Sequence, residues 1–103
     1  MKRLDVVFSH SAARDLDDIF HYIWKASRNP GIARAYVERI EERCHRIGNA
    51  PLGGRQRDDL AKGLRLTPFE KRAVIAYFVE DGQVVISNVF YGGKDYEALF
   101  LAE

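Results

Sequence analysis

Residues 73–91 read Ala73-Val74-Ile75-Ala76-Tyr77-Phe78-Val79, then Glu80-Asp81-Gly82-Gln83, then Val84-Val85-Ile86-Ser87-Asn88-Val89-Phe90-Tyr91. Two runs of β-branched and aromatic residues flank the Asp81-Gly82 pair, and such runs favour β-strands. Glycine accepts the positive φ that a two-residue hairpin turn requires. The sequence therefore predicts an antiparallel hairpin in the second half of the chain.

Two amphipathic helices are predicted before this hairpin. Apolar residues at helical spacing follow Ser9 or Ser11, either of which can cap a helix, and they continue to about Ala26. Pro30 suits the first position of a second helix, and Gly48 suits its C-terminal cap. Only a few residues separate the two helices, which predicts an antiparallel helical hairpin.

Two further strands complete the predicted order. Side chains alternate between apolar and other types at residues 3–8 and again at residues 64–67, where Pro68 ends the strand or marks an edge. The predicted order is β-α-α-β-β-β, an α+β fold in which the helical hairpin packs on one face of an antiparallel sheet. The two helices are predicted to pack on Ile75 and Tyr77 of the sheet. The helical side chains predicted to be buried there are Leu16, Ile19, Ile23, Tyr36, Val37, Ile40 and Ile47.

The size and composition of the chain allow one domain. Its 103 residues, of which 47% are hydrophobic and 30% charged, suit an ordinary globular protein. We therefore expect a single domain over residues 1–103. The one cysteine, Cys44, cannot form an internal disulfide and fits a reducing compartment. No long apolar segment is present, so we expect a cytoplasmic protein with no membrane partner.

The net charge of +1 hides an uneven distribution. Residues 52–79 carry six basic and three acidic side chains, whereas residues 80–103 carry one basic and five acidic side chains. A protein that coats DNA through its phosphates is usually more basic overall, and acidic residues within the second helix oppose phosphate. We therefore expect no direct sequence-specific nucleic-acid binding, although a focused cationic patch stays open.

Residue types that commonly carry catalysis or bind metals show no matching pattern. His10, His21 and His45 lie 11 and 24 residues apart, which fits no metal-binding spacing, so we predict no metal and no cofactor. Cys44 falls in the apolar stripe of the second helix, which favours a packed side chain over a nucleophile. The helical carboxylates alternate with arginines, as is typical of a solvated helix face.

Gly92-Gly93-Lys94-Asp95 follows the last predicted strand. It lacks the spacing of a phosphate-binding loop, and no long helix is predicted after it. The two glycines are better suited to release the chain from the sheet. We therefore expect Tyr96, Leu99 and Phe100 to fold back onto the sheet.

A group of arginines surrounds the predicted linker between helices and sheet. Arg55 and Arg57 follow the Gly53-Gly54 turn, Arg65 lies on the strand face opposite its leucine neighbours, and Arg72 begins the next strand. If Arg65 and Arg72 meet across the hairpin, they form a guanidinium cluster suited to bidentate binding of carboxylate or phosphate. The alternative is that the arginines form salt bridges with Asp58, Asp59 and Glu70, and spacing alone does not choose between the two.

Several short segments follow one another over nearly the whole chain. They are SAARDLDDI at residues 11–19, Tyr22-Ile23, Ala50-Pro51, GRQRDDL at residues 54–60, GLR at residues 63–65, VIAY at residues 74–77 and VFYGGKDYE at residues 89–97. In this order they resemble the ParE family of the RelE/ParE toxin-antitoxin superfamily. The usual residue at position 94 in that family is arginine, and Lys94 keeps the charge but loses the bidentate fork.

The resemblance implies a growth-arresting toxin of a type II toxin-antitoxin system. Such a toxin inhibits DNA gyrase by surface binding and is neutralised in a hetero-oligomer with a ParD-type antitoxin. Under this hypothesis the target-binding residues are Arg55, Arg57, Arg65, Arg72 and Lys94. Phe20 and Trp24 lie beyond the main apolar stripe of the first helix, and we expect them to bind the antitoxin. The antitoxin tail is expected to bind first as an amphipathic helix and then as an added strand, because the sheet should have at least one free edge.

The RelE relatives supply an alternative, because they cleave messenger RNA on the ribosome. That reaction needs an acid, a base and cations for the developing phosphate charge. The candidate catalytic residues for it are Arg65, Arg72, Lys94 and Tyr96. The chain has no histidine after His45 and ends in an acidic segment, so we favour the non-enzymatic gyrase inhibitor.

Overall fold

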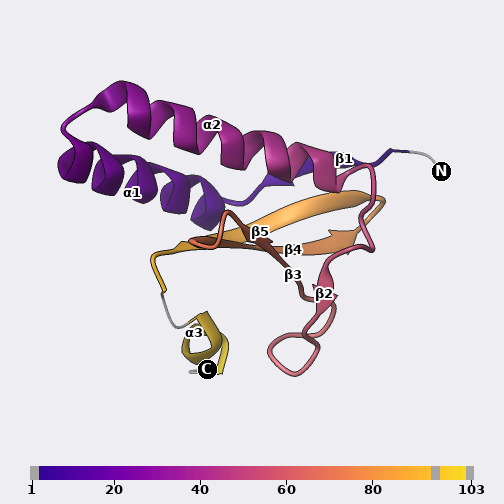
Figure 1. Cartoon of the computed structure of the whole chain (residues 1–103). Coiled ribbons are helices and arrows are strands. Elements are labelled where there is room, and N and C mark those ends of the chain that lie inside the picture. Colours follow the sequence, from indigo (N-terminus) through magenta and orange to yellow (C-terminus); the bar gives the residue numbers. More distant parts are fainter. Residues whose placement is uncertain (1–2, 94–95, 102–103) are drawn as a thin grey trace.

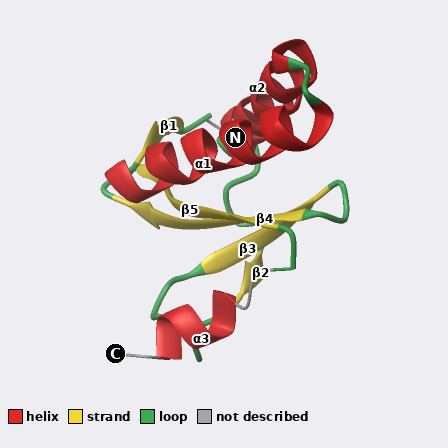
Figure 2. Ribbon diagram, turned by 90° about the vertical axis from the view of Figure 1, so that its left-hand side faces the viewer, coloured by secondary structure: helices red, strands yellow, loops and turns green. Residues whose placement is uncertain are grey.

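The protein is a mixed five-stranded sheet with a helical hairpin on one face and a short helix on the other (Figures 1 and 2). A computed structural model describes residues 3–93 and 96–101. Along the chain, the elements are β1 (Asp5–Phe8), α1 (His10–Ser27), α2 (Pro30–Ile47), β2 (Arg55–Gln56), β3 (Arg65–Phe69), β4 (Ala73–Glu80), β5 (Gln83–Tyr91) and α3 (Tyr96–Leu101). The predicted α+β fold with a helical hairpin on one sheet face is confirmed.

The strands lie in the order β1-β5-β4-β3-β2. The sheet is not wholly antiparallel as predicted, because β1 runs parallel to β5, with Val6 opposite Val84. The β4–β5 hairpin is confirmed: Asp81 and Gly82 connect it with φ of 53° and 74°, the two positive values of a type I′ turn. The strand β2 and the helix α3 were not predicted.

The helix ends follow from local hydrogen bonding. The Ser9 hydroxyl caps α1 by accepting from the Ala12 N–H at 3.0 Å, and Asn29 caps α2, in which Pro30 holds the first position. Gly48 does cap α2, but with a right-handed φ of −58°. A side chain there would collide with the Leu4 carbonyl oxygen, so the close approach of the segment just before β1 explains the glycine.

Two separate cores hold the layers together. The larger lies between the helical hairpin and the sheet, and it contains Ile40, Ile75 and Tyr77, each fully buried. The predicted helical core residues all belong to it, with Ile23 and Val37 only partly buried. The smaller core lies on the other sheet face, beneath α3 and the loop that precedes β3 (Figure 2).

The return of the C-terminal segment to the sheet is confirmed for two of its three residues. Tyr96 and Phe100 pack against the smaller core, and the Tyr96 ring stacks on Phe90 with centroids 5.6 Å apart. Leu99 was wrongly expected to join them and is 51% exposed, because it lies on the outer side of the short helix. Among the described residues, no helix is both long and apolar enough to cross a membrane.

Candidate functional site

The linker between α2 and β2 is fastened to the sheet by two side chains. The Tyr77 hydroxyl, fully buried, donates to the Pro51 carbonyl at 2.8 Å and accepts from the Gly54 N–H at 2.9 Å. Arg65 donates from Nη1 to the carbonyls of Leu52 at 2.9 Å and Gly54 at 2.8 Å. A side chain at position 54 would overlap the Tyr77 ring, so only glycine allows this approach. Arg65 therefore holds the linker in place.

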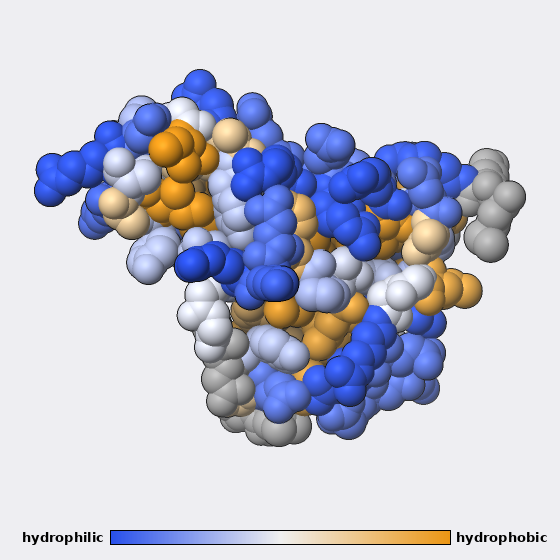
Figure 3. All heavy atoms as spheres, in the orientation of Figure 1, coloured by the Kyte–Doolittle hydropathy of each residue, from blue (hydrophilic) through white to orange (hydrophobic). Residues whose placement is uncertain are grey.

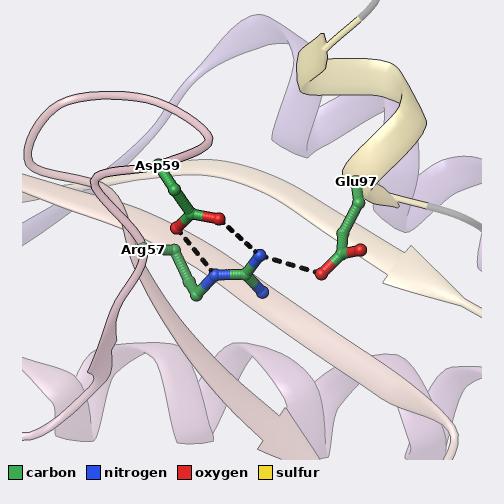
Figure 4. A network of polar contacts seen from close by, with 3 residues as sticks. All are labelled: Arg57, Asp59 and Glu97. Carbon is green, nitrogen blue, oxygen red and sulfur yellow. Dashed lines mark hydrogen bonds and ion pairs between the residues drawn. The ribbon is translucent and has the colours of Figure 1, made fainter.

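Arg57 lies at the centre of an ionic network that joins the following loop to α3 (Figure 4). Its Nε and Nη2 donate to the two Asp59 oxygens at 3.0 and 2.9 Å, and Nη2 also contacts Glu97 Oε2 at 2.8 Å. The Arg57 guanidinium lowers the pKa of the Asp59 carboxyl, and Asp59 and then Glu97 raise the pKa of Arg57. With its side chain only 14% exposed, Arg57 is largely neutralised by its own fold.

The structure does not bring Arg65 and Arg72 together. Arg65 pairs with Tyr77, whereas Arg72 follows the turn beyond Phe69, which pairs with Ala73. Four strand steps separate the two ends of β3, or about 13 Å at about 3.3 Å per residue. The guanidinium cluster suggested for these two residues therefore does not form.

The salt-bridge alternative is only partly realised. Arg57 pairs with Asp59, as that alternative suggested. Asp58 instead accepts from the Gly63 N–H at 2.9 Å. Glu70 binds Arg39 of α2 through two contacts of 2.9 and 3.0 Å. Arg39 was not among the candidates, because only the folded helix brings it to the β3–β4 turn.

The other predicted target-binding residues lie apart from one another. Arg55 is exposed on β2, where it pairs with Leu66 of β3. Arg72 is exposed at the β3–β4 turn, and with Tyr96 it lines a cavity of about 330 Å³. Lys94 lies outside the described residues.

The predicted antitoxin-binding residues share one flank of α1. Trp24 is 43% exposed, and its ring centroid lies 6.1 Å from that of the half-buried Phe20. Phe20 lines a groove of about 400 Å³ between α1 and α2. The other residues of this groove are Phe8, Ala13, Leu16, Asp17, Val37 and Glu41.

Apolar side chains also reach the surface where the two helices are connected (Figure 3). There Ile23 and Ile32 line a cavity of about 430 Å³ together with Tyr36 and Arg39 of α2 and with Glu70 and Arg72 of the β3–β4 turn. Ile32 is 52% exposed. This end of the helical hairpin offers a second apolar surface, which the helical periodicity alone does not predict.

The histidines and acidic residues give no metal centre in the described part of the chain. No group of three or more histidine, cysteine or acidic side chains is placed there to hold a metal ion. His45 packs edge-on against Phe8, and His21 packs against Phe20. Cys44 is fully buried in the larger core and is therefore a packed core residue, and this burial raises the pKa of its thiol to about 12.

Comparison with known proteins gives a family. A family model described as "ParE toxin of type II toxin-antitoxin system, parDE" matches residues 6–96. The chain belongs to the ParE toxin family. Among solved structures it is similar to one described as "Chromosomal ParDE TA system from P. aeruginosa", with a TM-score of 0.75. The two chains are 20% identical, and the match covers 87% of this ParE chain and 97% of the other, which supports the fold. No curated protein matches the chain significantly.

Several contacts in this ParE toxin join residues that are distant in the chain, and no local sequence pattern predicts them. Asp15 was interpreted as part of a solvated face, yet its Oδ2 accepts from the Val89 N–H of β5 at 2.9 Å. Tyr36 of α2 is a core residue as predicted, yet it also lines a surface cavity, and Tyr91 of β5 lines the same one. The aromatic type of Tyr36 and Tyr91 is the one sequence feature that points to a role at a surface. Their positions in the chain do not predict which residues they contact in the fold.

Proposed function

We propose that this ParE toxin inhibits DNA gyrase by binding it through a surface, without a catalytic step. A ribonucleolytic site needs its cations and its acid or base gathered around one phosphate. Arg65 is occupied by two linker carbonyls, and Arg72 lies at the opposite end of β3. This separation is the observation that carries the proposal, because a binding surface can use charges that do not converge.

The proposed gyrase contacts are the exposed members of the arginine group. Arg55 and Arg72 are exposed, whereas Arg57 and Arg65 are engaged within the fold. We therefore assign Arg55 and Arg72 to direct contact with gyrase. Lys94 is assigned to the same role on the basis of its positive charge alone. Arg57 and Arg65 then act by holding the loops that present this surface.

A supercoiling assay with purified gyrase tests the proposal. We expect inhibition by the wild-type toxin, unchanged inhibition by Tyr96→Phe, and weaker inhibition by Arg55→Ala. Loss of one exposed charge contact should weaken binding to gyrase by about 0.2 to 1 kcal/mol, which is a small effect. The double variant Arg55→Ala, Arg72→Ala removes two such contacts and should therefore show a larger loss of inhibition. Arg34→Ala, an exposed arginine on α2, is the matched control. Full inhibition by the double variant would contradict the assignment.

One observation favours a second candidate, ribosome-dependent cleavage of messenger RNA. Arg72 and Tyr96 line the same cavity, so a cation and a phenolic hydroxyl do face a shared space. Removal of a general acid or base typically lowers a rate by about a hundredfold to ten-thousandfold. If translating ribosomes show mRNA cleavage that Tyr96→Phe abolishes, while gyrase is unaffected, this second function replaces the first.

We further propose that a ParD-type antitoxin neutralises the toxin in the cytoplasm by covering the groove between α1 and α2. An amphipathic helix buries its apolar face in such a groove. Phe20 lines the groove, and the partly exposed Trp24 extends it along α1. Aromatic residues of this kind often anchor protein interfaces.

A further inference from the structure

Among the described residues, no strand pairs with the outer edge of β5 beyond the point where β1 ends. Pairing between the two strands stops at Phe8 and Ile86, but β5 continues to Tyr91. Ala76 pairs with Asn88 and Tyr77 pairs with Ile86, so β5 contains one extra residue, Ser87, at this point. This β-bulge determines which edge of β5 the following backbone N–H and C=O groups face. The Val89 N–H points away from β4 and donates to Asp15. Backbone groups two residues apart in a strand point the same way, so those of Tyr91 also face this edge.

A cavity of about 360 Å³ lies between this edge and α1. Asp15, Asp18 and Tyr22 lie three and four residues apart on one face of the helix, and all three line it. From the sheet, Val89 and Tyr91 line the opposite wall. The rings of Tyr22 and Tyr91 meet edge to face with centroids 5.7 Å apart.

The lining of this cavity is chemically suited to a cationic side chain. Within the described part of the chain, Asp15 accepts two hydrogen bonds, from the Val89 N–H and from Asn88 Nδ2, and both go to its Oδ2. Its other oxygen and the exposed Asp18 carboxylate are acceptors for a guanidinium. The faces of two tyrosines attract a cation, and Ile19 offers contact to an aliphatic stem. None of the seven lining residues is basic.

The open strand edge favours a peptide over a free small cation. The carbonyl of Val89 and the backbone groups of Tyr91 offer the hydrogen bonds that an added strand uses. An arginine on such a strand can place its side chain over the edge and into the cavity, beside the paired rings of Tyr22 and Tyr91. The cavity and the edge therefore recognise two parts of one ligand.

We propose that this cavity receives an arginine side chain carried on an extended segment of the antitoxin, which pairs with the edge of β5 at Val89 and Tyr91. The identity of the carrier rests on the proposed neutralisation by an antitoxin. The chemistry of the ligand, a basic residue in an extended peptide, rests only on the cavity. The site is separate from the groove that contains Phe20.

Binding of two synthetic peptides to the purified toxin tests this proposal. The first is acetyl-Thr-Val-Arg-Val-Thr-amide, and the second carries citrulline, a neutral isostere, in place of arginine. By NMR titration we expect the arginine peptide to shift the Tyr91 amide signal and to bind about tenfold more tightly than the citrulline peptide. Equal binding of both peptides, or binding of neither at millimolar concentration, would overturn the proposal.

Variants of the toxin locate the effect. Asp18→Asn should weaken binding of the arginine peptide about threefold or more, and Tyr22→Leu should also weaken it. The matched control is Asp81→Asn, which removes the same charge from the exposed β4–β5 turn and lies outside both the cavity and the groove that contains Phe20. An equal loss in the control would show a general charge effect and sink the proposal.

A competition experiment tests the role of the strand edge. Spermidine supplies a cation without a peptide backbone, and we expect it to bind far more weakly than the arginine peptide. Spermidine binding as tight as that of the peptide would refute pairing at the edge. A failed peptide experiment leaves neutralisation through Trp24 untouched, because that is measured separately with the intact antitoxin.

Discussion

At the scale of single residues, Tyr36 shows what burial does to a polar group. It is 8% exposed and packs between Phe69 and Tyr91, with the Arg39 guanidinium carbon 5.2 Å from its ring centroid. Its hydroxyl is buried and has no hydrogen-bond partner among the described residues. An unsatisfied buried hydroxyl costs about 1 to 3 kcal/mol. Tyr36→Phe should therefore raise the free energy of unfolding, by about 1 kcal/mol.

The same residue predicts a change of stability at alkaline pH. Burial, and then the neighbouring Tyr91, raise the pKa of Tyr36 to about 12, from the ordinary value of 10.0. Because the pKa is higher in the folded state, the unfolded state loses the phenolic proton first as the pH rises. The contribution to the free energy of unfolding is therefore complete below the unfolded pKa and is lost as the pH rises through the folded pKa. Urea unfolding should show a steeper fall between about pH 10 and 12 in the wild type than in Tyr36→Phe. A variant of the exposed Tyr22, Tyr22→Phe, is the control, and parallel curves for wild type and Tyr36→Phe would contradict the argument.

At the scale of elements, the packing of α2 gives a direct test of its buried face. Ile40 is fully buried in the larger core, whereas Ile32 on the same helix is 52% exposed. Ile40→Ala should lower the free energy of unfolding by about 2 to 5 kcal/mol, because it leaves a cavity that the core fills only partly. Ile32→Ala should change it by less than about 0.5 kcal/mol. Similar losses for the two variants would show that the face is wrongly assigned.

How far the elements were predictable depends on their length and on where their partners lie. α1, α2 and the β4–β5 hairpin were found because apolar periodicity and the Asp81-Gly82 turn are local signals. The two residues of β2 are too few to show any period. The parallel pairing of β1 with β5 depends on where the helical hairpin returns the chain. No local pattern in residues 3–8 carries that information.

At the scale of the whole molecule, the sequence predicted which residue types form the candidate site. It did not predict how those side chains are arranged in space. The basic character of residues 52–79 was visible in the sequence, but two of its arginines turn inward to hold loops. Arg57 reaches Glu97, forty residues away, and Arg39 reaches Glu70. Such partners follow from the tertiary fold, so charge counting overstated the free cationic surface.

The exposed aromatic flank of α1 gives the last prediction, which concerns the assembly with the antitoxin. Trp24 is 43% exposed in the toxin alone, and its ring adjoins Phe20, which lines the groove between α1 and α2. Covering this ring by an antitoxin helix removes apolar surface from water, so Trp24→Ala should weaken the complex by at least about 1 kcal/mol, or about fivefold in Kd. Isothermal titration with the purified ParD-type antitoxin measures this loss. Leu52→Ala is the control, since Leu52 is 65% exposed but belongs to the linker after α2. Unchanged affinity of a folded Trp24→Ala variant would place the antitoxin elsewhere on the toxin, because a buried tryptophan anchor cannot be removed from an interface without cost.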